Sequence, residues 1–195
     1  ARAGDTTRIV LTARDDFGNR DSTFAFPITL NASDGVFDIR ADGLQEAGRL
    51  AFKVVAERTG TFDLIAPNGS FTDTLYSFTV TPAALDSFAI ENIADFAIGF
   101  PTTPQTITIE ALDRFGNTVT DNSNLIVFFE KMPANSNSFS ITPANEALGS
   151  DGEFTQTVIS GTDVGDNLRI RVFSSVPAVS DTSNPFSAIA GNALS

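Results

Sequence analysis

The chain of 195 residues contains no histidine, no cysteine and no tryptophan, and it has one methionine and one tyrosine. Without histidine or cysteine, the chain cannot form a Ser-His-Asp triad, a cysteine nucleophile, a zinc site, a haem ligand or a disulfide. A bound metal would be a hard cation held by carboxylate, amide and carbonyl oxygens. The composition therefore predicts no cofactor other than Ca²⁺ or Mg²⁺.

Basic residues are also scarce, because 12 lysines and arginines face 24 aspartates and glutamates, for a formal charge of −12. This charge repels nucleic acid and anionic lipid, so we expect no nucleic-acid partner. The acidity is uneven: residues 1–85 carry 11 acids and 8 bases, whereas residues 86–195 carry 13 acids and 4 bases. Long apolar runs are missing as well. The longest, Leu125–Phe129, is too short to span a bilayer, and we expect no membrane insertion by this segment.

Two pairs of carboxylates that are close in the sequence could in principle supply the acid and the base of a glycosidase, namely Asp15 with Asp16 and Asp151 with Glu153. Such catalysis needs a deep groove and a raised pKa on one partner. Neighbouring surface residues indicate neither feature. We therefore predict that the protein is not an enzyme.

The apolar residues that are present, including 18 phenylalanines, recur with a period of two. This alternation places one set of side chains on a buried face and predicts antiparallel β-strands. Turn-forming residues such as those of Ser33–Gly35 separate the runs. Two segments, Leu44–Ala47 and Ala144–Leu148, could each hold one helical turn. The alternating runs are Ile9, Leu11, Ala13; Phe26, Ile28, Leu30; Leu50, Phe52, Val54; and Phe62, Leu64, Ala66.

An internal repeat indicates two domains. Residues 6–30 align with residues 104–128 at a constant offset of 98, and the shared residues stay in register. Farther along, Phe37 and Ile39 align with Phe139 and Ile141, and Gly48 aligns with Gly152. The sequence therefore predicts one domain over residues 1–85 and a second over residues 86–195.

The alignment also predicts that the first repeat lacks its first strand. The second repeat opens with the alternating run Ser87–Ile93, whereas residue 1 aligns with residue 99. Two explanations remain open. The chain is a window on a longer tandem array, or it is a subunit whose open edge is filled by a neighbour's strand.

Each repeat ends its first shared strand with the pattern Asp-x-Phe-Gly-Asn, at Asp15–Asn19 and Asp113–Asn117. Glycine suits the positive φ of a tight turn, aspartate and asparagine bond nearby amides, and we expect the phenylalanine to cover the end of the core. The pattern thus predicts a structural turn. Its residues are Phe17, Gly18 and Asn19 in the first copy and Phe115, Gly116 and Asn117 in the second.

A calcium site is the alternative interpretation of the same segments. No EF-hand spacing is present, and Arg14, Arg20 and Arg114 would oppose a cation. A third loop, Gly161–Asn167, could also bind calcium, although its residues are equally typical of a turn. The candidate ligands are Asp15, Asp16, Asn19 and Asp21; Asp113, Asn117 and Asp121; and Asp163 and Asp166.

The Phe-Gly-Asn turn after a Thr/Ile strand, the repeat near 98 residues and the linker Ala84-Leu85-Asp86 before Phe88 resemble the bacterial immunoglobulin-like repeats of invasin, intimin and other long surface adhesins. The resemblance implies an all-β fold of two tandem immunoglobulin-like antiparallel β-sandwich domains. It also implies an extracellular location on the bacterial cell surface. The chain has neither the lectin-like C-terminal domain nor the cysteine pair of the receptor-binding tips of those adhesins.

Three functions are compatible with the sequence. The leading prediction is a non-enzymatic stalk or spacer, whose partners are neighbouring repeats. The second is a filament subunit that polymerises with identical subunits by strand complementation. The third is a carbohydrate-binding accessory module, although the phenylalanines occupy core positions and saccharide platforms usually use tryptophan and tyrosine. A surface receptor or a polysaccharide is a further possible partner of the segment. If either repeat has a specific partner or ion, we expect it at the more acidic second repeat.

Overall fold

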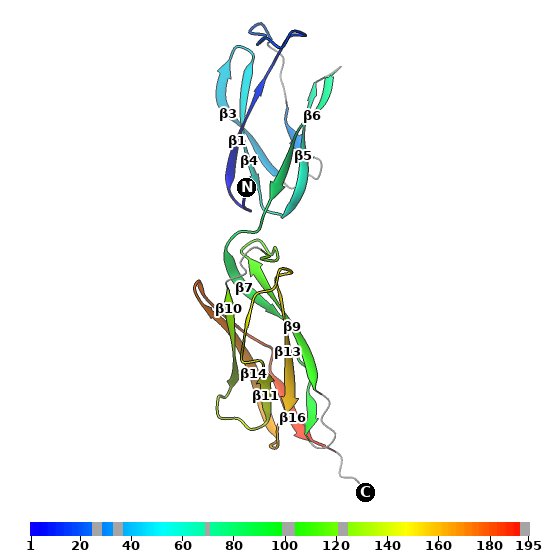
Figure 1. Cartoon of the computed structure of the whole chain (residues 1–195), viewed down its shortest axis with the longest axis vertical. Coiled ribbons are helices and arrows are strands. Elements are labelled where there is room, and N and C mark those ends of the chain that lie inside the picture. The colour runs from blue at the N-terminus through cyan, green and yellow to red at the C-terminus, as the bar shows by residue number, and fades with distance from the viewer. Residues whose placement is uncertain (25–28, 33–36, 69–70, 99–103, 121–124, 192–195) are drawn as a thin grey trace. The chain divides into compact units, whose positions relative to one another are not determined.

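A computed structural model describes residues 1–24, 29–32, 37–68, 71–98, 104–120 and 125–191, apart from the side chains of 43–45, 67–68, 71–76 and 159–160. The regular structure of these described residues consists of strands without any helix (Figure 1). The chain is thus all-β, as predicted. Its backbone divides into two compact units, Ala1–Ala83 and Ala84–Ser195, which we call the first and second units.

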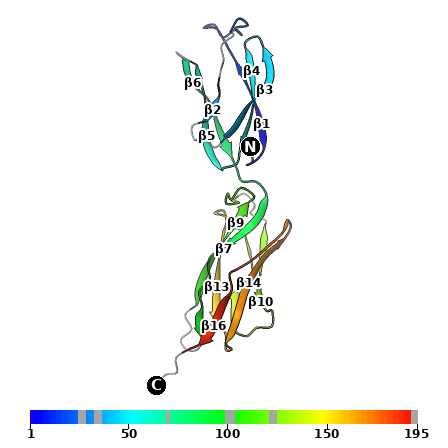
Figure 2. The same ribbon diagram turned by 180° about the vertical axis from the view of Figure 1, so that it is seen from behind.

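The strands of the first unit are β1 (Thr6–Thr12), β2 (Asn31–Ala32), β3 (Phe37–Glu46), β4 (Arg49–Ala56), β5 (Gly60–Asn68) and β6 (Phe71–Val80). They form two antiparallel sheets, ordered β1-β4-β3 and β2-β5-β6. The sheets face each other as two layers (Figures 1 and 2). Alternation explains this arrangement, because every second residue of β4 points inward: Phe52 is 5% exposed and Val54 is fully buried.

The strands of the second unit are β7 (Leu85–Ile90), β8 (Phe96–Ile98), β9 (Gln105–Asp113), β10 (Ile126–Met132), β11 (Phe139–Thr142), β12 (Asn145–Ala147), β13 (Glu153–Ser160), β14 (Gly165–Ser175), β15 (Ala178–Thr182) and β16 (Phe186–Ala190). One sheet has the order β11-β13-β9-β7. The other has the order β12-β10-β14-β16-β8, with β15 paired to β14. Only β8 and β16 pair in parallel among the described strands.

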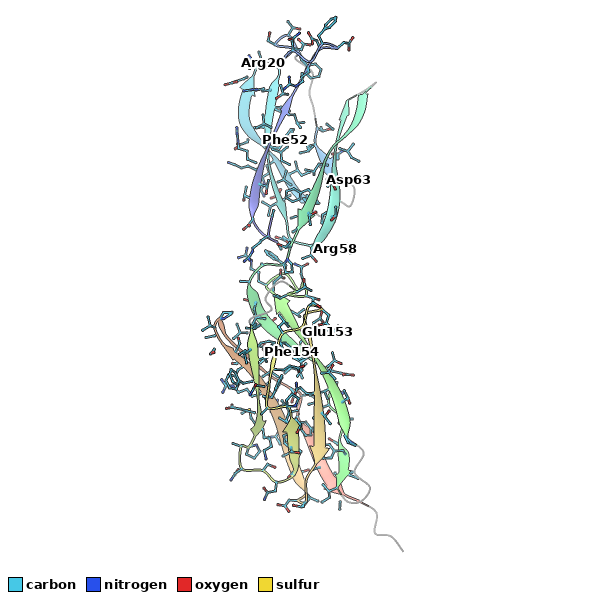
Figure 3. The ribbon with its side chains drawn as sticks, viewed as in Figure 1. Arg20, Phe52, Arg58, Asp63, Glu153 and Phe154 are labelled. Atoms are coloured by element: carbon cyan, nitrogen blue, oxygen red, sulfur yellow. The ribbon has the colours of Figure 1, made fainter. Side chains whose placement is uncertain are left out.

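Phenylalanines fill both cores. In the first unit, the Phe37 ring packs edge-on against Phe62, with ring centroids 4.9 Å apart. In the second, Phe139 packs edge-on against Phe186 at 5.2 Å. Figure 3 labels Phe154, which is 1% exposed, beside the solvent-facing Glu153. Burial of each such ring contributes about 1.5–3 kcal/mol, which explains how a chain without disulfides maintains two cores.

The register of the strands bears out the alignment of the two repeats. In the first unit Thr12 lies opposite Arg49, and the aligned residues of the second, Glu110 and Glu153, also lie opposite each other. The amide of Ala13 donates to the carbonyl of Gly48, just as Ala111 donates to Gly152. Both units therefore repeat one backbone plan down to single hydrogen bonds.

Two local predictions fail. The segments assigned a helical turn lie instead in β3 and its following turn and around β12, because each lies next to a strand that offers ladder hydrogen bonds. Of the alternating runs, Phe26 and Ile28 fall outside the described residues.

Candidate functional site

The Asp15–Asn19 turn is held by the side chain of Asp15. Its Oδ1 atom accepts hydrogen bonds from the amides of Phe17 at 3.0 Å and Asn19 at 2.8 Å, and its Oδ2 accepts Asn19 Nδ2 at 3.2 Å. The backbone closes the same loop, since Gly18 donates to the Asp15 carbonyl. These hydrogen bonds, above all those from Asn19, hold the pKa of Asp15 below its ordinary value.

The Asp113–Asn117 turn repeats this geometry. Asp113 Oδ1 accepts the amides of Phe115 and Asn117, both at 2.9 Å, and Asn117 Nδ2 donates to Asp113 Oδ2 at 2.9 Å. Here, however, the pair is enclosed, because Asp113 is 2% exposed and Asn117 is 9% exposed. A buried carboxylate that accepts several hydrogen bonds from its own turn acts as a structural anchor.

The phenylalanine of the turn does not have the expected role in the first unit. Phe17 is 90% exposed, so its ring does not cover the end of the core. In the second unit Phe115 is half-buried, and the Arg114 guanidinium lies 4.5 Å from the ring centroid. The prediction that this side chain plugs the core is therefore wrong for Phe17: the same aspartate hydrogen bonds form the turn in both units, so the turn does not itself fix where the ring lies.

Several carboxylate oxygens of the calcium candidates already accept hydrogen bonds from the protein. Asp21 Oδ1 accepts both the amide and the hydroxyl of Thr23, at 2.9 and 2.6 Å, and these bonds lower the pKa of Asp21. Arg14 Nη1 bonds the Gly18 carbonyl, which places a cation beside the first turn. Within the part of the chain that the structure describes, no three acidic side chains gather as a metal site would require. Asp121 lies outside the described residues.

The loop before β14 separates its two candidate ligands. Asp163 lies in the loop, where its Oδ1 atom is 3.2 Å from the Thr162 hydroxyl, whereas Asp166 lies within β14 itself. Asn167 follows with a φ of 56°, at the register shift between Gly165 and Leu168 where β14 pairs with β16. The loop is thus the start of a bulged strand, and Asn167 adopts the left-handed conformation that asparagine tolerates.

The outer face of the first unit's β1-β4-β3 sheet carries a charged cluster that the sequence did not reveal. Asp42 bridges two cations, with Oδ2 2.8 Å from Arg8 Nε and Oδ1 2.7 Å from Lys53 Nζ. Beside them, Arg8, Val10, Glu46, Arg49 and Ala51 line a hollow. The alternation of β1 and β4 indicates which of their side chains face outward. It does not place Asp42 beside them, because β3 shifts register between Ala41 and Gln45.

The equivalent face of the second unit has the opposite character. Glu110 and Glu153 lie directly opposite each other, and the described strands of the β11-β13-β9-β7 sheet contain no lysine or arginine. The Glu110 carboxylate accepts the Thr118 hydroxyl. Two threonine pairs, Thr108 with Thr155 and Thr106 with Thr157, continue the row. The two units thus share a backbone but display different surfaces.

An aromatic pair lies on the second sheet of the second unit. Phe128 and Phe173 are opposite each other and stack with centroids 5.3 Å apart. The Arg171 guanidinium lies over the Phe173 ring at 4.9 Å and also contacts Glu130. The Phe173 ring therefore contacts both an aromatic ring and a cation within the protein.

The outer edge of β1 also differs from that of its counterpart. Strand β9 pairs with β13 on one side and with β7 on the other, whereas β1 pairs with β4 alone among the described strands. No helix among the described residues is long and apolar enough to cross a membrane.

Comparison with known proteins supports the fold assignment. No protein-family model and no curated protein sequence matches the chain. Among solved structures, it is similar to the Escherichia coli adhesin FdeC, with a TM-score of 0.56 and 20% identity over 98% of this chain and 60% of that one. It is also similar to the Yersinia pseudotuberculosis adhesin InvE (TM-score 0.41, 18% identity, covering 95% of this chain and 55% of that one). A third structure is the D00-D0 segment of intimin (TM-score 0.49, 13% identity, covering 98% and 94%). The chain therefore has the immunoglobulin-like fold of adhesin domains, as its residues predicted.

Proposed function

We propose that the chain is a non-enzymatic stalk or spacer segment, built of two tandem domains, of a protein on the bacterial cell surface. The recurrence of one backbone plan in both units carries this proposal, because repetition of a small folded unit is how a chain gains length. The fold shared with the adhesin FdeC supports it. Different surfaces on the same backbone fold are also expected when the folded unit itself, and not a surface site, provides the function.

The strand arrangement suits a load-bearing role. In the second unit β16, near the end of the unit, pairs in parallel with β8, near its beginning, so a pull on the two ends acts along the strands. In the first unit, Ala3 N donates to Thr81 O at 2.8 Å and Thr81 N donates to Ala1 O at 2.9 Å, which is a short parallel ladder of the same kind. Force applied in this direction shears several hydrogen bonds together instead of opening them one by one.

Single-molecule pulling on the full chain tests the proposal. We expect two separate unfolding events, which release extended chains of about 29 nm from the first unit and about 39 nm from the second, since an extended residue spans roughly 3.5 Å. Ala3→Pro removes the amide that bonds Thr81, and Gly191→Pro removes the amide that bonds Ile98. Each variant should lower the unfolding force of its own unit and leave the unfolding force of the other unit unchanged. Gradual extension at low force, without discrete events, would refute a mechanical role.

A filament subunit is the second candidate: among the described strands β1 pairs with β4 alone, and an edge strand of this kind can accept a neighbour's strand. In that case, chains would assemble at high concentration through this edge. Sedimentation of the purified chain distinguishes the two functions. A chain that remains monomeric and folded at every concentration would exclude the filament and leave the stalk standing.

A further inference from the structure

The outward-facing side of β10 and β14 in the second unit exposes apolar side chains. Ile126 is 51% exposed and Met132 is 41% exposed, and Phe128 and Phe173 beside them are half-buried. The residues that alternate with these point into the core instead, and they are Val127, Phe129, Ile170 and Val172. We call the outward-facing set the outer β10–β14 face. It consists of Ile126, Phe128, Glu130 and Met132 from β10 and Arg169, Arg171 and Phe173 from β14.

The fold itself does not require apolar residues on this face. In the first unit β5 follows β4 as β14 follows β13 in the second, so the sheet that contains β5 and β6 is the equivalent one. Its outward residues are polar and exposed: Thr61 lies opposite Thr79, and Asp63 lies opposite Ser77. Exposed apolar side chains that gather on one face typically mark an interaction surface, and aromatic residues, methionine and arginine are enriched where two proteins meet. The outer β10–β14 face therefore indicates a protein partner.

The pairing of β10 with β14 makes this face complementary to itself. Phe128 lies opposite Phe173, and Glu130 lies opposite Arg171 at the next outward position. A two-fold axis that runs along the strands, between β10 and β14, places β10 of one chain over β14 of a second copy at the same height. Phe128 then meets Phe173 of the second copy, and Glu130 meets Arg171 of the second copy. Apolar side chains thus contact apolar ones, and each acid faces a base.

Charge also favours this face for contact between two copies. Residues 86–195 carry 13 acids and 4 bases, so most approaches between two second units bring like charges together. Two of the four bases, Arg169 and Arg171, belong to the outer β10–β14 face, which includes one acid, Glu130. Two copies that meet through this face therefore avoid the repulsion that an acidic face would cause.

We propose that the outer β10–β14 face is an interaction surface for a second copy of this chain. The two sheets pack face to face about a two-fold axis with their strands aligned, as sheets pack inside a sandwich. Arg171 Nη1 lies 3.3 Å from Glu130 Oε2 of its own chain, and both side chains are about half exposed, so each gains a second partner in the dimer. This contact closes on itself at two chains, whereas strand complementation gives an open-ended assembly. The proposal does not depend on the stalk role.

Sedimentation equilibrium of the full chain provides the first test. Between about 1 µM and about 1 mM, we expect the mass to rise to that of two chains and then to stay constant. Ile126→Thr should raise the dissociation constant at least about tenfold, because each dimer loses this apolar contact twice. Ile189→Thr is the matched control, since Ile189 is 50% exposed in the same unit and lies in β16, which pairs with the opposite end of β14. It should leave the dissociation constant unchanged.

An exchange of charges tests the two-fold register. Arg171→Glu and Glu130→Arg each bring like charges together in the proposed dimer, so each variant alone should stay monomeric. In an equimolar mixture of the two variants, every acid of one faces a base of the other, and the dimer should form again. A structural defect in either variant would not be repaired by adding the other, so rescue by mixing reports contact between these two positions.

Two probes confirm that the variants remain folded. Circular dichroism follows both units, and the fluorescence of Tyr76, the only tyrosine in a chain without tryptophan, follows the first unit alone. A parent chain that stays monomeric throughout would overturn the proposal and leave the stalk role standing. A dimer that Ile126→Thr and Ile189→Thr weaken equally would also overturn it, as would growth past two chains that does not respond to Ile126→Thr. Failure of the mixed variants to form a dimer would show that the two-fold register is wrong.

Discussion

Single glycines contribute to the fold in two different ways. Gly18 and Gly116 occupy the tips of the two turns, with φ values of 82° and 80°, and a side chain there would meet no other atom within 4 Å. Gly48 also has a positive φ, of 73°, but an added Cβ would collide with the carbonyl oxygen of Asp21. Turn conformation alone requires the first two glycines, whereas backbone packing also requires the third.

Substitution should separate these two requirements. We expect Gly18→Ala to lower the free energy of unfolding of the first unit by about 1 kcal/mol, the cost of a left-handed conformation. Gly48→Ala should cost about 3 kcal/mol, because overpacking adds to the same conformational cost. Urea unfolding followed by tyrosine fluorescence measures both. Equal costs would show that the contact with Asp21 is easily relieved.

The candidate calcium ligands include the same residues that form the turns. Asp15 and Asp21 already accept hydrogen bonds from their own loops, so we expect them to gain little from a cation. The midpoint of thermal unfolding should be the same with millimolar Ca²⁺ and with a chelator. A ligand that binds only the native state must stabilise it, so a rise with Ca²⁺ would establish a site. Asp113→Asn, Asp163→Asn and Asp166→Asn would then locate it.

At the scale of elements, the outer face of β1, β3 and β4 is organised by one carboxylate. Lys53 and then Arg8 hold the pKa of Asp42 below its ordinary value of 3.8. A carboxyl group with a lowered pKa in the folded state contributes stability above its unfolded pKa, and this contribution is lost as the pH falls through the folded pKa. The interaction therefore acts at neutral pH and disappears in acid.

Asp42→Asn should reveal this contribution. We expect the variant's first unit to be less stable than the parent at pH 7, with the difference shrinking as the pH falls below about 4. Chemical denaturation at a series of pH values, followed by tyrosine fluorescence, measures it. Asp38→Asn is the matched control, because Asp38 pairs with Arg40 and is more exposed than Asp42. A difference that does not depend on pH would mean that Asp42 acts through packing.

The sequence allowed accurate prediction of strands wherever a buried face alternates with a wet one. The runs around Phe52 and Phe62 are examples, and both side chains are buried. The helical turn predicted at Leu44–Ala47 was wrong, because the propensity of four residues is outweighed by pairing with the neighbouring strand. The alternation of apolar residues indicates which face of a strand is buried, but it does not indicate where the register between two paired strands shifts.

The candidate turns were predictable in position but not in burial. Asp15 and Asp113 accept the same hydrogen bonds because these depend on local spacing. The exposure of Phe17 could not be predicted, since it depends on side chains that are distant in the sequence. The same limit applies to Asp42, whose cationic partners lie 34 residues before it and 11 after it.

At the scale of the whole molecule, the two units should respond in opposite ways to salt. Residues 86–195 carry −9 of the net charge of −12, whereas the first unit's outer face contains ion pairs. Screening relieves repulsion within an acidic unit and weakens exposed pairs. Raising NaCl from about 0.02 to about 0.5 M should therefore stabilise the second unit and slightly destabilise the first.

Two probes make this measurement possible in the intact chain. Tyrosine fluorescence reports the first unit, and circular dichroism reports both. The two thermal transitions should move in opposite directions as salt increases. Parallel movement would show that the charge difference between the units has no energetic effect.

The facing glutamates of the second unit also affect how the chain reaches its fold. Like charges directly opposite each other destabilise a strand pair, and the aligned pair in the first unit is Thr12 with Arg49. If β9 paired with β4 during refolding, Glu110 would meet Arg49 instead of Glu153. Exchange of strands between the repeats therefore relieves a repulsion that the native pairing retains. We therefore expect correct folding to be favoured when each repeat closes its own sheets before its neighbour's strands become available.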